Sequence, residues 1–328
     1  MKIIDLHCDT ICVIDRFKRK KNENISLIEN SLQIDEKKLI SGNYFAQCFA
    51  MFVFLEGENP FEACVNEIDT FYQKIEECEN IKLALNYDDL IKNNTDNKVS
   101  AILTIEEGGV CKGNLSFLNI FYRLGIRMIC LNWNFENEIG FPNYGKFIED
   151  KPDYITPNIK DGLTEFGFTM VKRMNELGMI VDVSHLSDKG FWDVLNTSSK
   201  PIVASHSNAR GVCKHVRNLT DEMIIALHKK GGVMGMNYCA SFLNDDETIG
   251  KNTIDCLIEH IIYIKNLVGV DVIALGSDFD GINSDIELKD ASYMVGFVER
   301  LVQEGFSKDE IDKICYLNAL RVFKEVLK

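Results

Sequence analysis

The sequence of 328 residues has no excess of basic charge, since 36 lysines and arginines stand against 50 aspartates and glutamates. The net charge of -14 argues against a nucleic-acid-binding protein, because contacts with phosphates need a basic surface. No run of about 18 apolar residues is present, so no membrane span is expected. The N-terminus also lacks the uninterrupted apolar segment of a signal peptide.

Prolines and paired cysteines are scarce as well. Only 5 prolines occur, and no linker or internal repeat divides the chain. We therefore expect a single domain over residues 1–328. The 11 cysteines are an odd number and include no CxxC pair. This pattern is typical of reduced, buried thiols rather than of a disulfide framework, and it predicts a cytoplasmic protein.

Short apolar segments alternate along the chain with helical patterns. Strands are predicted at 2–7, 44–54, 99–105, 126–132, 179–184, 201–205, 232–237 and 271–276. Helices are predicted at 61–79, 114–124, 162–177, 188–196, 219–230, 252–268 and 287–304. The tail 307–327 opens with a capping-box pattern. Eight strands alternating with helices predict a (β/α)₈ barrel of the TIM type. Two longer connections, 10–43 and 134–161, are expected to be loop insertions near its mouth.

The first predicted strand runs directly into polar residues. On a strand, residues two apart share a face, so Asp5, His7 and Asp9 are expected to point the same way. An imidazole and a carboxylate at a strand end can bind a divalent cation. A lone histidine bonded to an aspartate inside the core would give the same local sequence. The interpretation of these residues as a metal site therefore needs further evidence from the rest of the sequence.

Polar side chains also follow other predicted strands at their C-terminal ends, where barrels of this type concentrate their chemistry. They are Glu106 and Glu107, His185, His206 and Asp278. Only 6 histidines occur, and three of them stand at strand ends. Each residue alone could be a turn or cap residue, but together they favour one metal-centred pocket. Imidazole and carboxylate ligands suit Zn²⁺, and Mn²⁺ or Fe²⁺ also fit.

The number of candidate ligands bears on the number of metals. Five ligands exceed what one tetrahedral Zn²⁺ accepts, and they suit two cations about 3.5–4 Å apart. Such a site lowers the pKa of bound water and polarises a carbonyl group. Of the other histidines, His228 and His260 are expected in helices and His215 in a loop.

The motifs at the strand ends belong to a larger set of segments, at 5–10, 107–109, 122–127, 182–185, 205–207, 217–218, 276–281 and 318–322. Together, over nearly the whole chain, they resemble the membrane dipeptidase (renal dipeptidase) family of zinc peptidases, in the amidohydrolase superfamily. This resemblance implies a hydrolase, a metalloprotease with two Zn²⁺ ions, which cleaves small dipeptides by means of a hydroxide bridging the two metals. It also implies a substrate with a free C-terminal carboxylate, tolerance of a D-residue there, and a homodimer.

The resemblance further implies a role for each strand-end residue. His7 and Asp9 would bind one metal, and His185 and His206 would bind the other. Glu107, the residue directly before the two glycines of its motif, would bridge both metals, and Glu106 would not be a ligand.

The remaining roles concern the substrate. Asp278 would pass the proton of the bridging water to the leaving amine, and Arg217 would bind the substrate carboxylate. Well-known members have a histidine after the fourth strand, where this chain has Trp133. We expect Trp133 to contact the substrate and Asn134 to donate a hydrogen bond to the oxyanion formed in the reaction. Tyr238 is a further candidate for substrate contact.

Two other functions are compatible with the sequence. A different amidohydrolase, acting on N-acyl amino acids, cyclic amides or lactones, would use the same metal ligands with different loops. A catalytically impaired metal-binding homologue would follow if the loss of the histidine at position 133 had removed turnover.

Overall fold

Eight parallel strands form a closed barrel in this computed structural model. They are β1 (Ile3–Asp5), β2 (Tyr44–Met51), β4 (Val99–Ile105), β5 (Ile126–Cys130), β8 (Ile180–Asp182), β9 (Val203–Ala204), β10 (Val233–Met236) and β11 (Ile273–Leu275). The strand order is β2-β1-β11-β10-β9-β8-β5-β4, and the pairing of β2 with β4 closes the barrel. The (β/α)₈ barrel is confirmed, and each of its strands coincides with a predicted one. The structure describes residues 1–144, 147–148, 151–245, 253–282 and 287–328.

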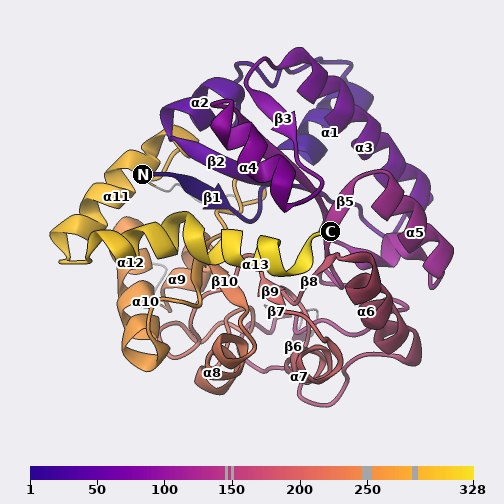
Figure 1. The fold of residues 1–328 in the computed structure, drawn as a ribbon. Helices are drawn as coiled ribbons and strands as arrows, with labels where there is room; N and C mark the ends of the chain where they lie inside the picture. The colour runs from indigo at the N-terminus through magenta and orange to yellow at the C-terminus, as the bar shows by residue number, and fades with distance from the viewer. Residues whose placement is uncertain (145–146, 149–150, 246–252, 283–286) are drawn as a thin grey trace.

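Helices surround the strands (Figure 1). The longer ones are α1 (Thr10–Lys21), α3 (Pro60–Glu77), α4 (Tyr87–Thr95), α5 (Leu115–Arg123), α6 (Glu165–Leu177), α7 (Asp188–Thr197), α8 (Asp221–Lys229), α10 (Thr253–Val268), α11 (Met294–Gln303) and α13 (Asn318–Val326). The short ones are α2 (Glu36–Ser41), α9 (Ala240–Leu243) and α12 (Lys308–Asp312). The predicted capping box is present at Ser307 and Glu310. Residue 252, at the start of one predicted helix, lies outside the described residues.

The connection 10–43 differs from the loop that the sequence predicted. Helix α1 starts at Thr10, directly after Asp9, and buries Ile11 and Ile14, while basic residues occupy its last turn. Cations there interact favourably with the helix dipole, so a segment that looked merely charged forms a stable amphipathic helix. Helix α2 follows in the same connection. A short strand, β3 (Ile81–Leu83), pairs with β4 outside the barrel and was not predicted.

The connection 134–161 contains one short hairpin within the residues that the structure describes. Its strands are β6 (Phe147–Ile148) and β7 (Lys151–Pro152), which pair antiparallel. Positions 145–146 and 149–150 of this predicted insertion lie outside the described residues.

The C-terminal helix α13 covers the end of the barrel where the strands begin (Figure 1). Its residues Val322 and Phe323 share an apolar cluster with strand residues such as Ile102. Asn318 Nδ2 donates hydrogen bonds to the carbonyls of Val270 (2.7 Å) and Ile273 (2.9 Å), at the start of β11. This end is therefore filled by side chains, and the polar strand ends lie at the opposite one.

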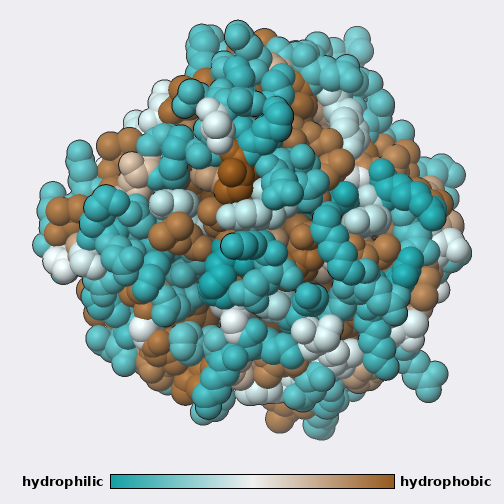
Figure 2. Space-filling model, viewed as in Figure 1, coloured by the Kyte–Doolittle hydropathy of each residue, from teal (hydrophilic) through white to brown (hydrophobic). Residues whose placement is uncertain are grey.

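The surface is largely hydrophilic, and the cysteines are unpaired. Hydrophilic side chains cover most of the face that carries α13, with hydrophobic ones scattered between them (Figure 2). Across the described ranges, no helix is both long and apolar enough to cross a bilayer. All eleven cysteines are free thiols, and ten of them are buried, as the sequence predicted.

We predict that Asn318→Ala lowers the free energy of unfolding by about 1–3 kcal/mol, because it removes two buried hydrogen bonds, to the carbonyls of Val270 and Ile273. Denaturant unfolding followed by circular dichroism measures the change. Asn196→Ala, at an exposed position of α7, is the control and should stay within about 0.5 kcal/mol of the parent protein. Equal stability of the two variants would show that α13 is not anchored by this side chain.

Candidate active site

Polar side chains converge at the C-terminal end of the barrel. His7 and Asp9 follow β1, Glu106 follows β4, and His185 and His206 follow β8 and β9. All five are buried. Because parallel strands end on the same rim of a barrel, residues far apart in the sequence meet here.

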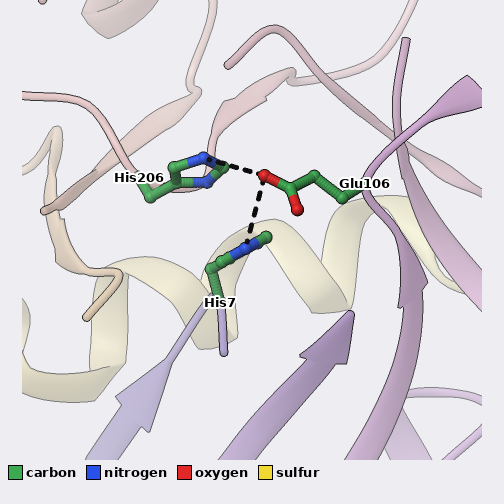
Figure 3. A group of neighbouring side chains, drawn as sticks. All are labelled: His7, Glu106 and His206. Carbon is green, nitrogen blue, oxygen red and sulfur yellow. Dashed lines mark ion pairs between the residues drawn. The ribbon is translucent and has the colours of Figure 1, made fainter. Parts of the chain in front are cut away.

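The carboxylate of Glu106 points toward the imidazole rings of His7 and His206 (Figure 3). Its Oε1 atom is 3.2 Å from the Nε2 atom of His185. The same oxygen is 3.6 Å from Nε2 of His206 and 3.7 Å from Nε2 of His7. The Nε2 atom of His7 is also 3.3 Å from Oδ2 of Asp9. One carboxylate therefore faces three imidazole rings. We call these rings, of His7, His185 and His206, the histidine cluster.

The structure corrects the choice between the two adjacent glutamates. Glu107 faces away from the histidine cluster, and its carboxylate accepts hydrogen bonds from the backbone of Gly109 and Trp133 and from Asn137. Successive residues of a strand point to opposite sides. Ile102 belongs to the interior cluster under α13 and Leu103 to the layer beneath the outer helices. Glu106 continues the interior face of Ile102.

Glu107 holds the loops instead of facing the cluster. Its Oε1 is 2.6 Å from the Gly109 nitrogen, and its Oε2 is 2.7 Å from the Trp133 nitrogen. Burial raises the pKa of Glu107 to about 7, although these hydrogen bonds act in the opposite direction. Glu107, which was chosen from its position in the family motif, therefore fixes the turn after β4 and the start of the loop after β5.

The outer nitrogens of two imidazoles are held by neighbouring side chains. Nδ1 of His185 lies 2.9 Å from Oδ1 of Asn134, so this nitrogen donates. Nδ1 of His206 lies 2.7 Å from Oγ of Ser205, which itself donates to Oδ2 of Asp182 at 2.5 Å. Both rings are therefore protonated at Nδ1, which leaves the lone pairs of Nε2 directed into the cluster.

This arrangement fits a cation. The Nε2 atoms of His185 and His206 are only 2.9 Å apart, and two lone pairs at that distance repel each other. Nε2 of His7 is buried and makes no hydrogen bond of acceptable geometry. Burial on its own would lower the pKa of His7, but nearby carboxylates, first that of Glu106, raise it to about 10. A divalent cation would satisfy both the lone pairs and the excess of negative charge.

Asp278 borders the cluster from the end of β11. Its Oδ1 is 3.8 Å from Nε2 of His7, and its Oδ2 accepts a hydrogen bond of 2.9 Å from Asn237. Burial raises the pKa of Asp278 to about 6. At Gly281 a Cβ atom would lie 2.1 Å from Oδ2 of Asp9 and 2.7 Å from Oδ1 of Asp278. The glycine therefore makes room for these two carboxylates to face the histidines.

Arg217 is a buried cation beside the cluster. Its guanidinium makes only long hydrogen bonds among the described residues, 3.3 Å to the carbonyl of His206 and 3.5 Å to Oγ of Ser207. Its Nε atom has no hydrogen-bond partner. Within the described part of the chain, no carboxylate forms an ion pair with it. A buried guanidinium left in this state is well suited to bind the carboxylate of a ligand.

Two cavities meet at the cluster. One, of about 370 Å³, is bordered by Asp9, Glu106 and Asp278 and by Trp133. The other, of about 640 Å³, is bordered by Arg217. Asn134 and His185 border both cavities, so the cluster lies where they join. We call them the aromatic cavity and the arginine cavity.

Tyr238 does not reach either cavity, and its predicted contact with the substrate is wrong. Its side chain is buried, and its hydroxyl lies 3.5 Å from the sulfur of Met294. Alternation along β10 explains this, because Asn237 points to the cluster and the next residue must point outward. Asn237, Asp182 and Ser205 are polar residues that the sequence analysis missed. Alternation at the strand ends was the signal that could have identified them.

The other residues singled out from the sequence lie away from the cluster. Asp5 shares no part of it, because its carboxylate accepts hydrogen bonds from the backbone of His7 and from Ser277. His260 is buried in α10 between Ala209 and Leu243. His228 lies in α8, as predicted.

His215 borders the arginine cavity. Its Nδ1 accepts a hydrogen bond of 3.1 Å from the backbone nitrogen of Arg217. Its ring lies 5.2 Å from that of Tyr154 and 4.4 Å from that of Phe242. Burial lowers the pKa of His215 to about 3, so the ring is neutral near pH 7. A neutral ring in this position supports the loop that carries Arg217.

The fold is shared with known peptidases. A metallopeptidase from Rhodobacter sphaeroides, liganded with a phosphinate mimic of the dipeptide L-Ala-D-Ala, has a TM-score of 0.88 and 22% identity, with 99% of each chain covered. The probable dipeptidase PvdM from Pseudomonas aeruginosa has a TM-score of 0.81 and 21% identity, covering 92% of this chain and 90% of the other. At these identities the likeness is one of fold.

Sequence relatives extend the comparison. The chain is 32% identical to the dipeptidase tcpJ of Claviceps purpurea over 305 residues, which are 89% of this chain and 69% of that protein. It is 36% identical to an uncharacterized protein from the pqqA 5' region of Klebsiella pneumoniae, over 75% of this chain and 89% of the relative. The sequence profile of the membrane dipeptidase family, peptidase family M19, matches residues 1–328. The chain therefore belongs to the membrane dipeptidase family of metallopeptidases.

Proposed function

We propose that this protein hydrolyses small dipeptides at a pair of divalent cations bound by the histidine cluster. Membership of a dipeptidase family gives the reaction class. The observation that carries the proposal is Oε1 of Glu106, which lies within 3.7 Å of three imidazole nitrogens. A carboxylate in that position could bridge two cations.

The ligands divide into two groups. His7 and Asp9 would bind one cation, His185 and His206 the other, and Glu106 both. The ligand atoms of His7, Glu106 and His206 all lie within 4.8 Å of one another, which fits a compact site. We propose Zn²⁺ as the cation, since imidazole and carboxylate are common zinc ligands, and Mn²⁺ or Fe²⁺ also fit. When bound, the cations supply Lewis-acid chemistry, acidifying water and polarising a carbonyl.

The chain's own residues would position the substrate and move the proton. Arg217 binds the C-terminal carboxylate from the arginine cavity. Asp278, at the edge of the aromatic cavity, accepts a proton from water and delivers it to the leaving amine. The side-chain oxygen Oδ1 of Asn134 accepts a hydrogen bond from His185, so the side-chain NH₂ group can still donate to a developing oxyanion.

The preferred dipeptide is part of the proposal. The Rhodobacter sphaeroides peptidase has a mimic of L-Ala-D-Ala bound. We extend this to dipeptides with an L- or a D-residue at the C-terminus, because Arg217 grips the carboxylate rather than a side chain. The homodimer and the cytoplasmic location stay predictions from the sequence.

We predict that purified protein hydrolyses a panel of dipeptides and that a chelator abolishes the activity. Asp278→Asn should lower kcat by about 10²–10⁴-fold, because proton transfer by a positioned side chain contributes that much. Stopped assays of released amino acids measure both effects. Asp161→Asn, at an exposed position, is the control. Turnover of N-acyl amino acids without any dipeptide hydrolysis would favour the alternative amidohydrolase.

A second prediction compares the two adjacent glutamates. Glu106→Gln should lose bound metal, because it removes the charge shared between the cations, whereas Glu107→Gln should keep the metal and lose stability. Metal content by mass spectrometry and denaturant unfolding separate the two effects. The reverse result, metal lost only from Glu107→Gln, would restore Glu107 as the bridging ligand.

A third prediction concerns the residues behind His206. Ser205→Ala should weaken metal binding about 10–100-fold, since it removes the group that fixes the tautomer of His206. Competition with a chromogenic chelator measures the affinity. Ser116→Ala, at an exposed position near the start of α5, should leave it unchanged. Unchanged affinity in Ser205→Ala would mean that His206 is oriented by packing alone.

A further inference from the structure

The aromatic cavity has a wall of rings on one side of the histidine cluster. Phe52, Phe54 and Trp133 border it, and Val13, Phe242 and Ile282 line it elsewhere. Phe52 and Phe54 follow β2 two residues apart, so they share a side while Val53 turns into the core.

The rings form one continuous surface. The Phe52 ring centroid is 4.9 Å from those of both Phe54 and Trp133, and the Trp133 and Phe54 centroids are 5.8 Å apart. The Phe135 ring centroid lies 5.0 Å from that of Trp133, but Phe135 does not border the cavity. Phe54 is 49% exposed, although a large apolar side chain is normally buried. An exposed aromatic wall beside a reactive cluster is a surface for a ligand.

The position of Arg217 decides which part of a dipeptide reaches this wall. Arg217 borders the arginine cavity and not the aromatic one, while His185 and Asn134 border both. A dipeptide with its carboxylate on Arg217 and its scissile bond at the cluster therefore extends its N-terminal residue into the aromatic cavity. Resting on the proposed function, we propose that this cavity selects dipeptides with a large apolar N-terminal side chain.

The charges around the cavity favour an apolar side chain over an acidic one. Arg16 also borders it, but Arg16 is exposed and remains hydrated. Asp278 and Asp280 border the cavity as well, and because neither is a proposed cation ligand, their carboxylates repel a further negative charge. An apolar side chain can be buried against the aromatic rings without any opposite charge to neutralise it.

The test measures kcat/KM for Gly-Ala, Ala-Ala, Leu-Ala and Phe-Ala, with Ala-Leu and Ala-Phe as the reversed series. We expect Phe-Ala and Leu-Ala to exceed Gly-Ala by about 10–100-fold, as a filled apolar pocket provides. The reversed series should vary less. Glu-Ala tests the acidic alternative, and its preference over Phe-Ala would overturn the proposal.

Phe54→Ala should reduce the ratio of Phe-Ala to Gly-Ala at least about 5-fold, through KM more than kcat, because the wall acts on binding. Metal content should stay at the parent level. Tyr293→Ala, an exposed aromatic outside both cavities, is the matched control and should leave the ratio unchanged. Dipeptide hydrolysis without N-terminal preference would overturn this inference alone. Absence of any dipeptide hydrolysis would overturn the proposed function and the inference with it.

Discussion

The convergence of three imidazole Nε2 atoms on one carboxylate oxygen is the constraint around which the rest of the site is arranged. Nε2 of His185 and Nε2 of His206 are 2.9 Å apart, which is unfavourable unless a positive charge is shared between them. The protein maintains this contact by fixing the far side of each ring, with Asn134 for His185 and Ser205 for His206. The cost of burying so many polar groups is met by hydrogen bonds outside the cluster.

Backbone strain is also present at this site. His185 and Asp278 have φ values of 67° and 63°, in the left-handed region that disfavours residues with a Cβ atom. Such a conformation costs about 1–2 kcal/mol per residue. Both residues lie just after a barrel strand, where the chain must turn sharply and still direct a side chain inward. Strain at two residues of one site is consistent with selection for function rather than for stability.

The sequence predicted the barrel well because its signals are local. Eight short apolar runs spaced by helical patterns identify the strands, and residues at strand ends identify the rim. It failed where a side chain's direction mattered. Motif matching chose Glu107 over Glu106, and Tyr238 was chosen where Asn237 faces the cluster. In both pairs, the inward residue continues the interior face of its strand, which motif spacing alone does not show.

Other features lay beyond any local signal. The bond from Ser205 to Asp182 joins two strands and depends on their register, so no pattern within one segment predicts it. The aromatic wall likewise combines residues after β2 with residues after β5. Composition records these aromatic residues, but only the closed barrel shows that they face the same cavity.

Helix α13, which covers the far end of the barrel, also affects the route by which reaction products leave. Since α13 and the apolar cluster above it fill that end, a cleaved substrate has to depart through the rim by which it arrived. In the proposed binding mode, the N-terminal amino acid would leave from the aromatic cavity, whereas the C-terminal one would stay paired with the buried guanidinium of Arg217. Free amino acids would then compete with the substrate for Arg217 and slow turnover as they accumulate.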